Sequence, residues 1–128
     1  MSTRRLILSL VASAIPCLAT AATSAHELEG VWNRGDGNTQ VRIAPCGANL
    51  CATNTWVRNA LSGEAVGDQL VLTLKKNGPG RYAGRAVQTR RGLTLTMTVT
   101  KVGEGRFSTS GCIAGSSDCR STTWTAAR

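Results

Sequence analysis

The stretch Leu93-Thr94-Leu95-Thr96-Met97-Thr98-Val99-Thr100 decides the fold class, because apolar residues and threonines alternate along its whole length. Alternation with a period of two places the two sets of side chains on opposite faces of a β-strand. Threonine is β-branched, which favours a strand over a helix. The stretch therefore predicts a strand whose leucines, Met97 and Val99 face a core while the threonines face solvent.

Similar alternation recurs along the chain, as in Leu70, Leu72 and Leu74, and turns rich in Gly, Asn, Asp and Pro separate the repeats. Eight strand-sized segments are predicted: 30–34, 39–45, 51–58, 69–75, 80–88, 93–101, 105–112 and 119–126. Even spacing with short connections is typical of an antiparallel meander. A meander that closes on itself has no exposed edges. We expect an all-β fold, an eight-stranded antiparallel barrel rather than a sandwich.

The interior of such a barrel is wide enough to be filled by side chains or to hold one small ligand. Leucines and valines at the inward positions could fill most of it, so we expect a packed core. The alternative is a ligand cavity near the barrel mouth. The candidate residues for a ligand site or a barrel end are Trp32, Trp56 and Trp124.

The N-terminus has the pattern of an export signal. Arg4 and Arg5 precede an apolar run, and small residues follow, with candidate cleavage sites after Ala21 and Ala25. The run is shorter than the ~20 residues needed to span a bilayer, so we expect no transmembrane span. The arginine pair leaves open a twin-arginine route, in which export follows folding. We expect a signal peptide over 1–25, one mature domain over 26–128, and a periplasmic or extracellular location.

Cysteine usage supports an oxidising compartment. Cys17 lies in the signal segment, which leaves Cys46, Cys51, Cys112 and Cys119. An even number outside the cytosol indicates two disulfides, and four cysteines allow three pairings. The spacing favours the two local pairs, because each brackets a Gly-containing turn. The alternative, a four-thiolate zinc site, usually has closer spacing than that between the last two cysteines.

The chain is basic, with a formal net charge of +8. Lys75, Lys76 and Arg81 flank one predicted turn, and Arg90 and Arg91 lie on the next. Successive turns of a meander lie at opposite ends, so these residues form two separate rims rather than one nucleic-acid track. We expect solvated hairpin tips, with contact to an anionic component of the cell envelope as the functional alternative.

Catalytic residue patterns are sparse. The only histidine, His26, precedes the first strand, and we expect it to be disordered. An N-terminal copper site there would need a second histidine, or cleavage after Thr23 so that His26 is the third residue of the mature chain. The carboxylates lie before the first strand or in predicted turns, and disulfide formation leaves no free thiol in the mature chain. We expect no enzyme activity, no cofactor and no bound metal.

Several segments resemble known families. Gly30-Val31-Trp32 is similar to the Gly-x-Trp start of lipocalin and calycin barrels, in which the tryptophan closes one end of the barrel. Residues 41–51, Trp56, Gly111-Cys112 and residues 119–125 together resemble the exported bacterial family called domain of unknown function 2147. That resemblance implies a barrel and export. It implies no catalytic residue, because the family has no established activity.

The middle of the chain departs from the family pattern. Asn59–Asp68 replaces a longer family segment, and Ala126 stands where the terminal arginine would be, so a shortened or divergent member is expected. The first strand is also similar to the opening of avidin-type barrels, but no second motif supports biotin binding.

The function expected from these observations is that of a non-enzymatic binding module. Its partner would be an envelope protein, an anionic envelope polymer or a lipid headgroup. The alternative is a carrier that holds a small apolar ligand in the barrel mouth, and an enzyme of unknown type is a remote third reading.

Overall fold

The structure, a computed structural model, describes residues 25–127 and is a closed antiparallel barrel of eight strands. The predicted signal segment lies outside the described residues except for Ala25. The elements in chain order are η2 (His26–Leu28), β1 (Gly30–Arg34), β2 (Thr39–Cys46), β3 (Asn49–Val57), η3 (Ala60–Ser62), β4 (Gln69–Gly78), β5 (Arg81–Gln88), β6 (Leu93–Gly103), β7 (Arg106–Ile113) and β8 (Cys119–Ala126). The expected all-β barrel is confirmed.

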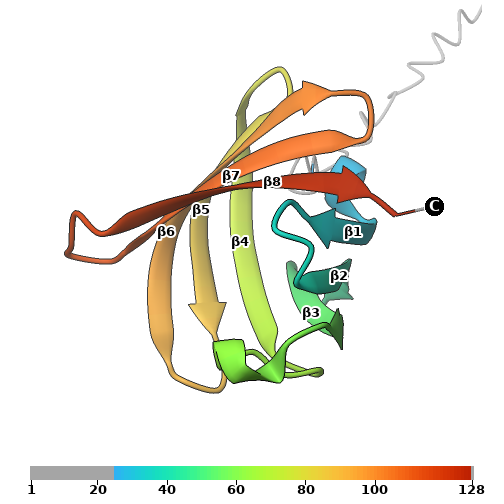
Figure 1. Cartoon of the computed structure of the whole chain (residues 1–128). Helices are drawn as coiled ribbons and strands as arrows, with labels where there is room; N and C mark the ends of the chain where they lie inside the picture. The colour runs from blue at the N-terminus through green and yellow to red at the C-terminus, as the bar shows by residue number, and fades with distance from the viewer. Residues whose placement is uncertain (1–24, 128) are drawn as a thin grey trace, which may run out of the picture.

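Each strand pairs with the next along the chain, and β1 pairs with β8 to close the barrel (Figure 1). The turns after β2, β4 and β6 lie at one end, together with η2, and we call this the closed end. The connections after β1, β3, β5 and β7 lie at the other, which we call the open end. The β7–β8 hairpin projects to one side of the barrel (left in Figure 1).

The alternation in β6 has the predicted orientation. Leu93, Leu95, Met97 and Val99 line the barrel interior, so the threonines between them lie on the outer face. The buried residues form two clusters, one at the closed end around Trp32 and one along the barrel wall around Leu72.

Both predicted disulfides are present in the local pairing, Cys46–Cys51 and Cys112–Cys119. Gly111 and Ile113 line the interior, so Cys112 between them faces outward by strand alternation. The first bridge ties β2 to β3 at the closed end, and the second ties β7 to β8 at the open end. Neither bridge occupies the interior.

None of the helices within residues 25–127 is long and apolar enough to cross a membrane.

Candidate functional site

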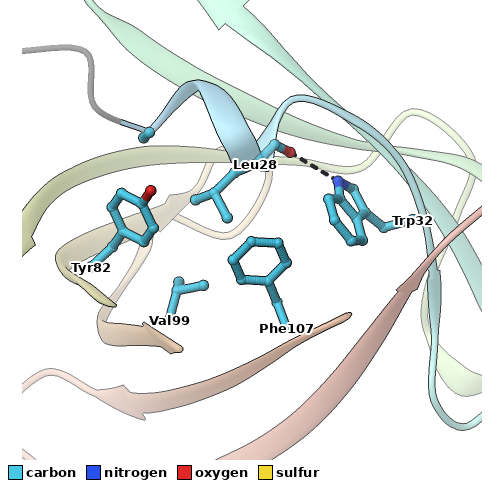
Figure 2. Packing of buried hydrophobic residues seen from close by; sticks show 6 residues of the cluster. Leu28, Trp32, Tyr82, Val99 and Phe107 are labelled. Atoms are coloured by element: carbon cyan, nitrogen blue, oxygen red, sulfur yellow. Dashed lines mark hydrogen bonds between the residues drawn. The ribbon is translucent and has the colours of Figure 1, made fainter. Parts of the chain in front are cut away.

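The closed end of the barrel is sealed by aromatic and aliphatic side chains that meet the short helix η2. Leu28 of η2 is buried against Trp32, Tyr82, Val99 and Phe107 (Figure 2). The Trp32 indole Nε1 donates a hydrogen bond to the Leu28 carbonyl oxygen at 2.8 Å. The Trp32 and Phe107 rings meet edge to face, with centroids 5.1 Å apart. Trp32 therefore lies at the closed end of the barrel.

A partly buried hydrogen bond ties η2 to the barrel wall. The Tyr82 hydroxyl, on a side chain that is only 1% exposed, donates to the Glu27 carboxylate. Burial raises the pKa of Tyr82, and the hydrogen bond to Glu27 raises it further. The expectation that His26 is disordered is wrong, because His26 begins η2 and its Nδ1 lies 2.9 Å from Glu29 Oε2.

The residues that seal the closed end form the floor of a cavity of about 520 Å³ inside the barrel. Its wall is largely apolar and includes Val41, Ile43, Leu72, Leu95 and Met97. The expectation of a packed core is therefore wrong. The physical reason is that small side chains occupy several inward positions, among them Ala52 and Gly111, so the leucines and valines do not fill the space.

Gly111 gives the cavity part of its width. It lies between Met97 on β6 and Arg120 on β8 in the strand register. A Cβ atom added at Gly111 would have only the Leu95 Cδ1 atom within 4 Å, at 4.0 Å. The space beside Arg120 is therefore open, and both residues line the cavity.

The other two tryptophans differ in position. Trp124 lines the cavity, and its Nε1 donates to the Thr109 hydroxyl at 2.9 Å. Trp56 is 48% exposed and is not among the cavity-lining residues. Trp56 therefore lies outside the cavity, although it is next to the last residue of β3, at the open end of the barrel. The shift of register between Gln40 and Val41, opposite the end of β3, interrupts the regular alternation there.

An ion-pair network crosses the open end. Arg34, at the end of β1, donates from Nη2 to Glu64 Oε2 at 2.8 Å and from Nη1 to Glu64 Oε1. Its Nε lies 2.9 Å from Asp36 Oδ1. The hydrogen bonds from Arg34 hold the pKa of Glu64 and of Asp36 below their usual values, although burial opposes both shifts. The same contact with Glu64 raises the pKa of Arg34.

Glu64 belongs to the β3–β4 connection, residues 58–68, which we call the lip. Asn38, which is 9% exposed, holds the lip through both ends of its amide. Its Nδ2 donates to Glu64 Oε2 at 2.6 Å, and its Oδ1 accepts from the Asn59 backbone N–H at 3.0 Å. Glu64 and Asp68 of the lip also line the cavity, so the lip forms part of the mouth.

The arginines of the β5–β6 turn hold the lip from the other side. Arg90 Nη2 lies 3.2 Å from Asp68 Oδ2 and donates to the Gly63 carbonyl oxygen at 2.9 Å. Arg91 Nη2 reaches the same carbonyl at 3.5 Å and lines the cavity. These two arginines were predicted as solvated tips, whereas in the structure they contact the mouth of the cavity.

The remaining predicted basic residues lie at the opposite end, as the meander required. Lys75, Lys76 and Arg81 are exposed around the β4–β5 turn. This turn packs against β6, where the Lys101 backbone N–H donates to the Gly80 carbonyl oxygen at 2.7 Å. Lys101 therefore lies next to the predicted rim, and its Nζ lies 3.9 Å from Glu104 Oε2.

Sequence reasoning missed four residues of the mouth: Arg34, Glu64, Gly111 and Arg120. Continuing the alternation of β8 backward from Trp124 places Thr122 and Arg120 inside the barrel, so that signal was available. Nothing in the sequence links Arg34 to Glu64, which is thirty positions away. Among residues 25–127, no three His, Cys, Asp or Glu side chains are grouped so that they could hold a metal ion.

Comparison with known proteins identifies a family. No curated protein and no solved structure matches the chain significantly. A family model described as "uncharacterized protein conserved in bacteria (DUF2147)" matches residues 30–126, which is nearly all of the described barrel. The match begins at the first strand and ends with the last, so it covers the cavity and its mouth. The chain therefore belongs to the bacterial DUF2147 family.

Proposed function

We propose that this protein binds a small, mostly apolar molecule with one polar end inside the barrel. The observation that carries this proposal is the cavity of about 520 Å³, which opens beside the lip. Ligand sites in proteins are usually apolar cavities of roughly 300–1,000 Å³ with a few polar groups that orient the ligand. This cavity has that size and composition.

The distribution of polarity along the cavity supports one orientation of the ligand. The floor consists of Leu28, Trp32, Val99 and Phe107, whereas charged and amide side chains line the mouth. Burying an apolar group among the floor residues at the closed end is favourable, because it removes apolar surface from water. A polar group at the mouth can keep its hydrogen bonds to water and to the polar side chains there. The ligand would therefore enter with its apolar end first.

Arg120 supports an anionic or hydrogen-bond-accepting polar end. Within residues 25–127 its guanidinium makes no side-chain hydrogen bond or ion pair, in contrast to Arg34 and Arg90. Arg91 has only the long contact to Gly63. Asp118 also lines the mouth and opposes an anion there. A guanidinium with free donors is suited to carboxylate, sulfonate or phosphate oxygens.

Fluorescence titration with 1-anilinonaphthalene-8-sulfonate tests the proposal, because this compound combines an apolar body with one sulfonate. Trp32 and Trp124 line the cavity, so we expect saturable quenching of tryptophan emission at one site. A Trp56→Phe background removes the emission of the exposed tryptophan. Absence of saturable binding would overturn the proposal.

A cavity-filling variant gives the test its specificity. Gly111→Phe places a ring in the open space beside Leu95 and should weaken binding at least about tenfold by occupying ligand volume. Ser110→Phe is the matched control, because Ser110 is the neighbouring residue on the outer face of β7. Equal binding by the two variants would place the compound outside the barrel.

We further propose that the chain is exported and acts by binding rather than catalysis. Two disulfides support an oxidising compartment, because disulfides persist outside the cytosol. The ion pairs of Glu64 and Asp68 support a structural role for these mouth carboxylates. Mass spectrometry of the protein recovered from its natural location would give both the mature N-terminus and the disulfide state; free thiols there would contradict export.

A second candidate function is contact with an anionic envelope polymer at the closed end. The packing of the β4–β5 turn on β6 supports it, because this brings Lys101 close to the predicted rim of Lys75, Lys76 and Arg81. We expect binding to lipopolysaccharide that weakens as salt is added, since exposed charges are screened. The double variant Lys75→Glu/Lys76→Glu should lose this binding, and salt-independent binding would contradict the idea.

A further inference from the structure

The lip carries the most exposed large apolar side chain of the described residues. Leu61 is 94% exposed, and Val66 on the same lip is 65% exposed. Single exposed apolar residues are common on protein surfaces. These two, however, project from a segment that forms the cavity mouth and is fixed there by Arg34, Asn38 and Arg90.

The charges around the lip favour an anionic surface. Its two carboxylates, Glu64 and Asp68, are paired with Arg34 and Arg90. Arg58, at the start of the lip, is exposed, and the Arg91 guanidinium lies against Gly63 in the middle of the lip. Arg34 is shared between Glu64 and Asp36, so the cationic groups of this surface that make no ion pair within the described part of the chain are Arg58 and Arg91. The lip thus presents two apolar tips beside these two arginines.

We propose that the lip docks the open end of the barrel onto an anionic lipid bilayer. Leu61 and Val66 would enter the boundary between headgroups and acyl chains, and Arg58 and Arg91 would contact lipid phosphates. The inference rests on the proposed function, because a mouth that faces the bilayer lets an apolar ligand pass between membrane and cavity without crossing water. An apolar tip within a basic surface fits a bilayer better than a soluble anionic polymer, which offers no acyl layer.

The test is co-sedimentation of the full mature chain with vesicles. We expect binding to vesicles of phosphatidylglycerol and phosphatidylcholine, and at least about tenfold weaker binding to vesicles of phosphatidylcholine alone. The variant Leu61→Ser/Val66→Ser should weaken binding to the anionic vesicles about tenfold or more. Val102→Ser is the matched control, because Val102 is 49% exposed near the closed end, and it should bind as the wild type does.

Three outcomes would overturn the inference: no binding to anionic vesicles, unchanged binding by the lip variant, or loss of binding in Lys75→Glu/Lys76→Glu, which would place contact at the closed end. Titration with 1-anilinonaphthalene-8-sulfonate in solution separates this result from the proposed function. If the wild type binds the dye but not the anionic vesicles, the docking inference is overturned and the cavity function is not. If the wild type does not bind the dye, the cavity function is overturned.

Discussion

Two inward-facing glycines have opposite roles at the residue scale. A Cβ added at Gly84 would lie 1.9 Å from the Thr73 carbonyl oxygen, so β4 and β5 approach closely only because this side chain is absent. A Cβ added at Gly111 meets nothing closer than 4.0 Å. One glycine therefore permits strand pairing, and the other leaves open volume in the cavity.

Alanine at these two positions should have different effects. Gly84→Ala forces the backbones of β4 and β5 apart, and we expect it to lower the free energy of unfolding by about 3 kcal/mol or more. Gly111→Ala should change it by less than about 1 kcal/mol, because the methyl group has room. Urea unfolding followed by circular dichroism measures both. Equal destabilisation would mean that the interior around Gly111 is filled.

At the scale of elements, the strands can be recognised from local sequence patterns, whereas the short helix η2 cannot. The alternation of β6 and the turn residues beside it predicted strand bounds within a few positions of those observed. The helix η2 has only three residues and no side-chain cap. Besides Trp32, four residues after Leu28, it is held by Tyr82, which lies 55 positions from Glu27 and reaches η2 only in the folded barrel. Sequence reasoning therefore found the strands and missed η2.

The lip is an element whose position should depend on pH. The pKa of Glu64 is held below its ordinary value of about 4.5, so the folded state favours the ionised carboxylate. The resulting stabilisation is complete well above that ordinary value and is lost as the pH falls through the lower folded-state pKa. Glu64→Gln should reduce the free energy of unfolding by about 1–2 kcal/mol at about pH 7.

The difference between wild type and Glu64→Gln should shrink as the pH falls through the lowered folded-state pKa of Glu64, since below that pKa the carboxylate is protonated in both folded and unfolded chains. Urea unfolding of both proteins across the acid range measures it. Glu104→Gln is the control, because Glu104 has a 99% exposed side chain whose ion pair with Lys101 is 3.9 Å long, so its substitution should change the free energy of unfolding little. A difference that persists unchanged at low pH would contradict an ionic role for Glu64.

At the scale of the whole molecule, the cavity is a property of the register between strands. Alternation assigns a residue to the inside, but the free volume depends on which residues lie opposite one another. The register puts Ala86 between Leu72 and Leu95, and it puts Gly111 between Met97 and Arg120. The cross-strand partners of Ala86 and Gly111 cannot be derived from the sequence pattern of a single strand. This explains why the barrel was predicted correctly and its packed interior was not.

The two disulfides provide a test of the whole molecule, because they lie at opposite ends and on the outer face. Each closes a short loop, and restriction of the unfolded chain predicts a contribution of about 2 kcal/mol per bridge. Replacing each pair by serines should lower the free energy of unfolding by about that amount, and the two losses should add since the sites are distant. The β-sheet circular dichroism and the dye binding should remain, because barrel closure depends on the β1–β8 pairing and the floor around Trp32. Loss of dye binding in the folded serine variants would show instead that the bridges shape the cavity.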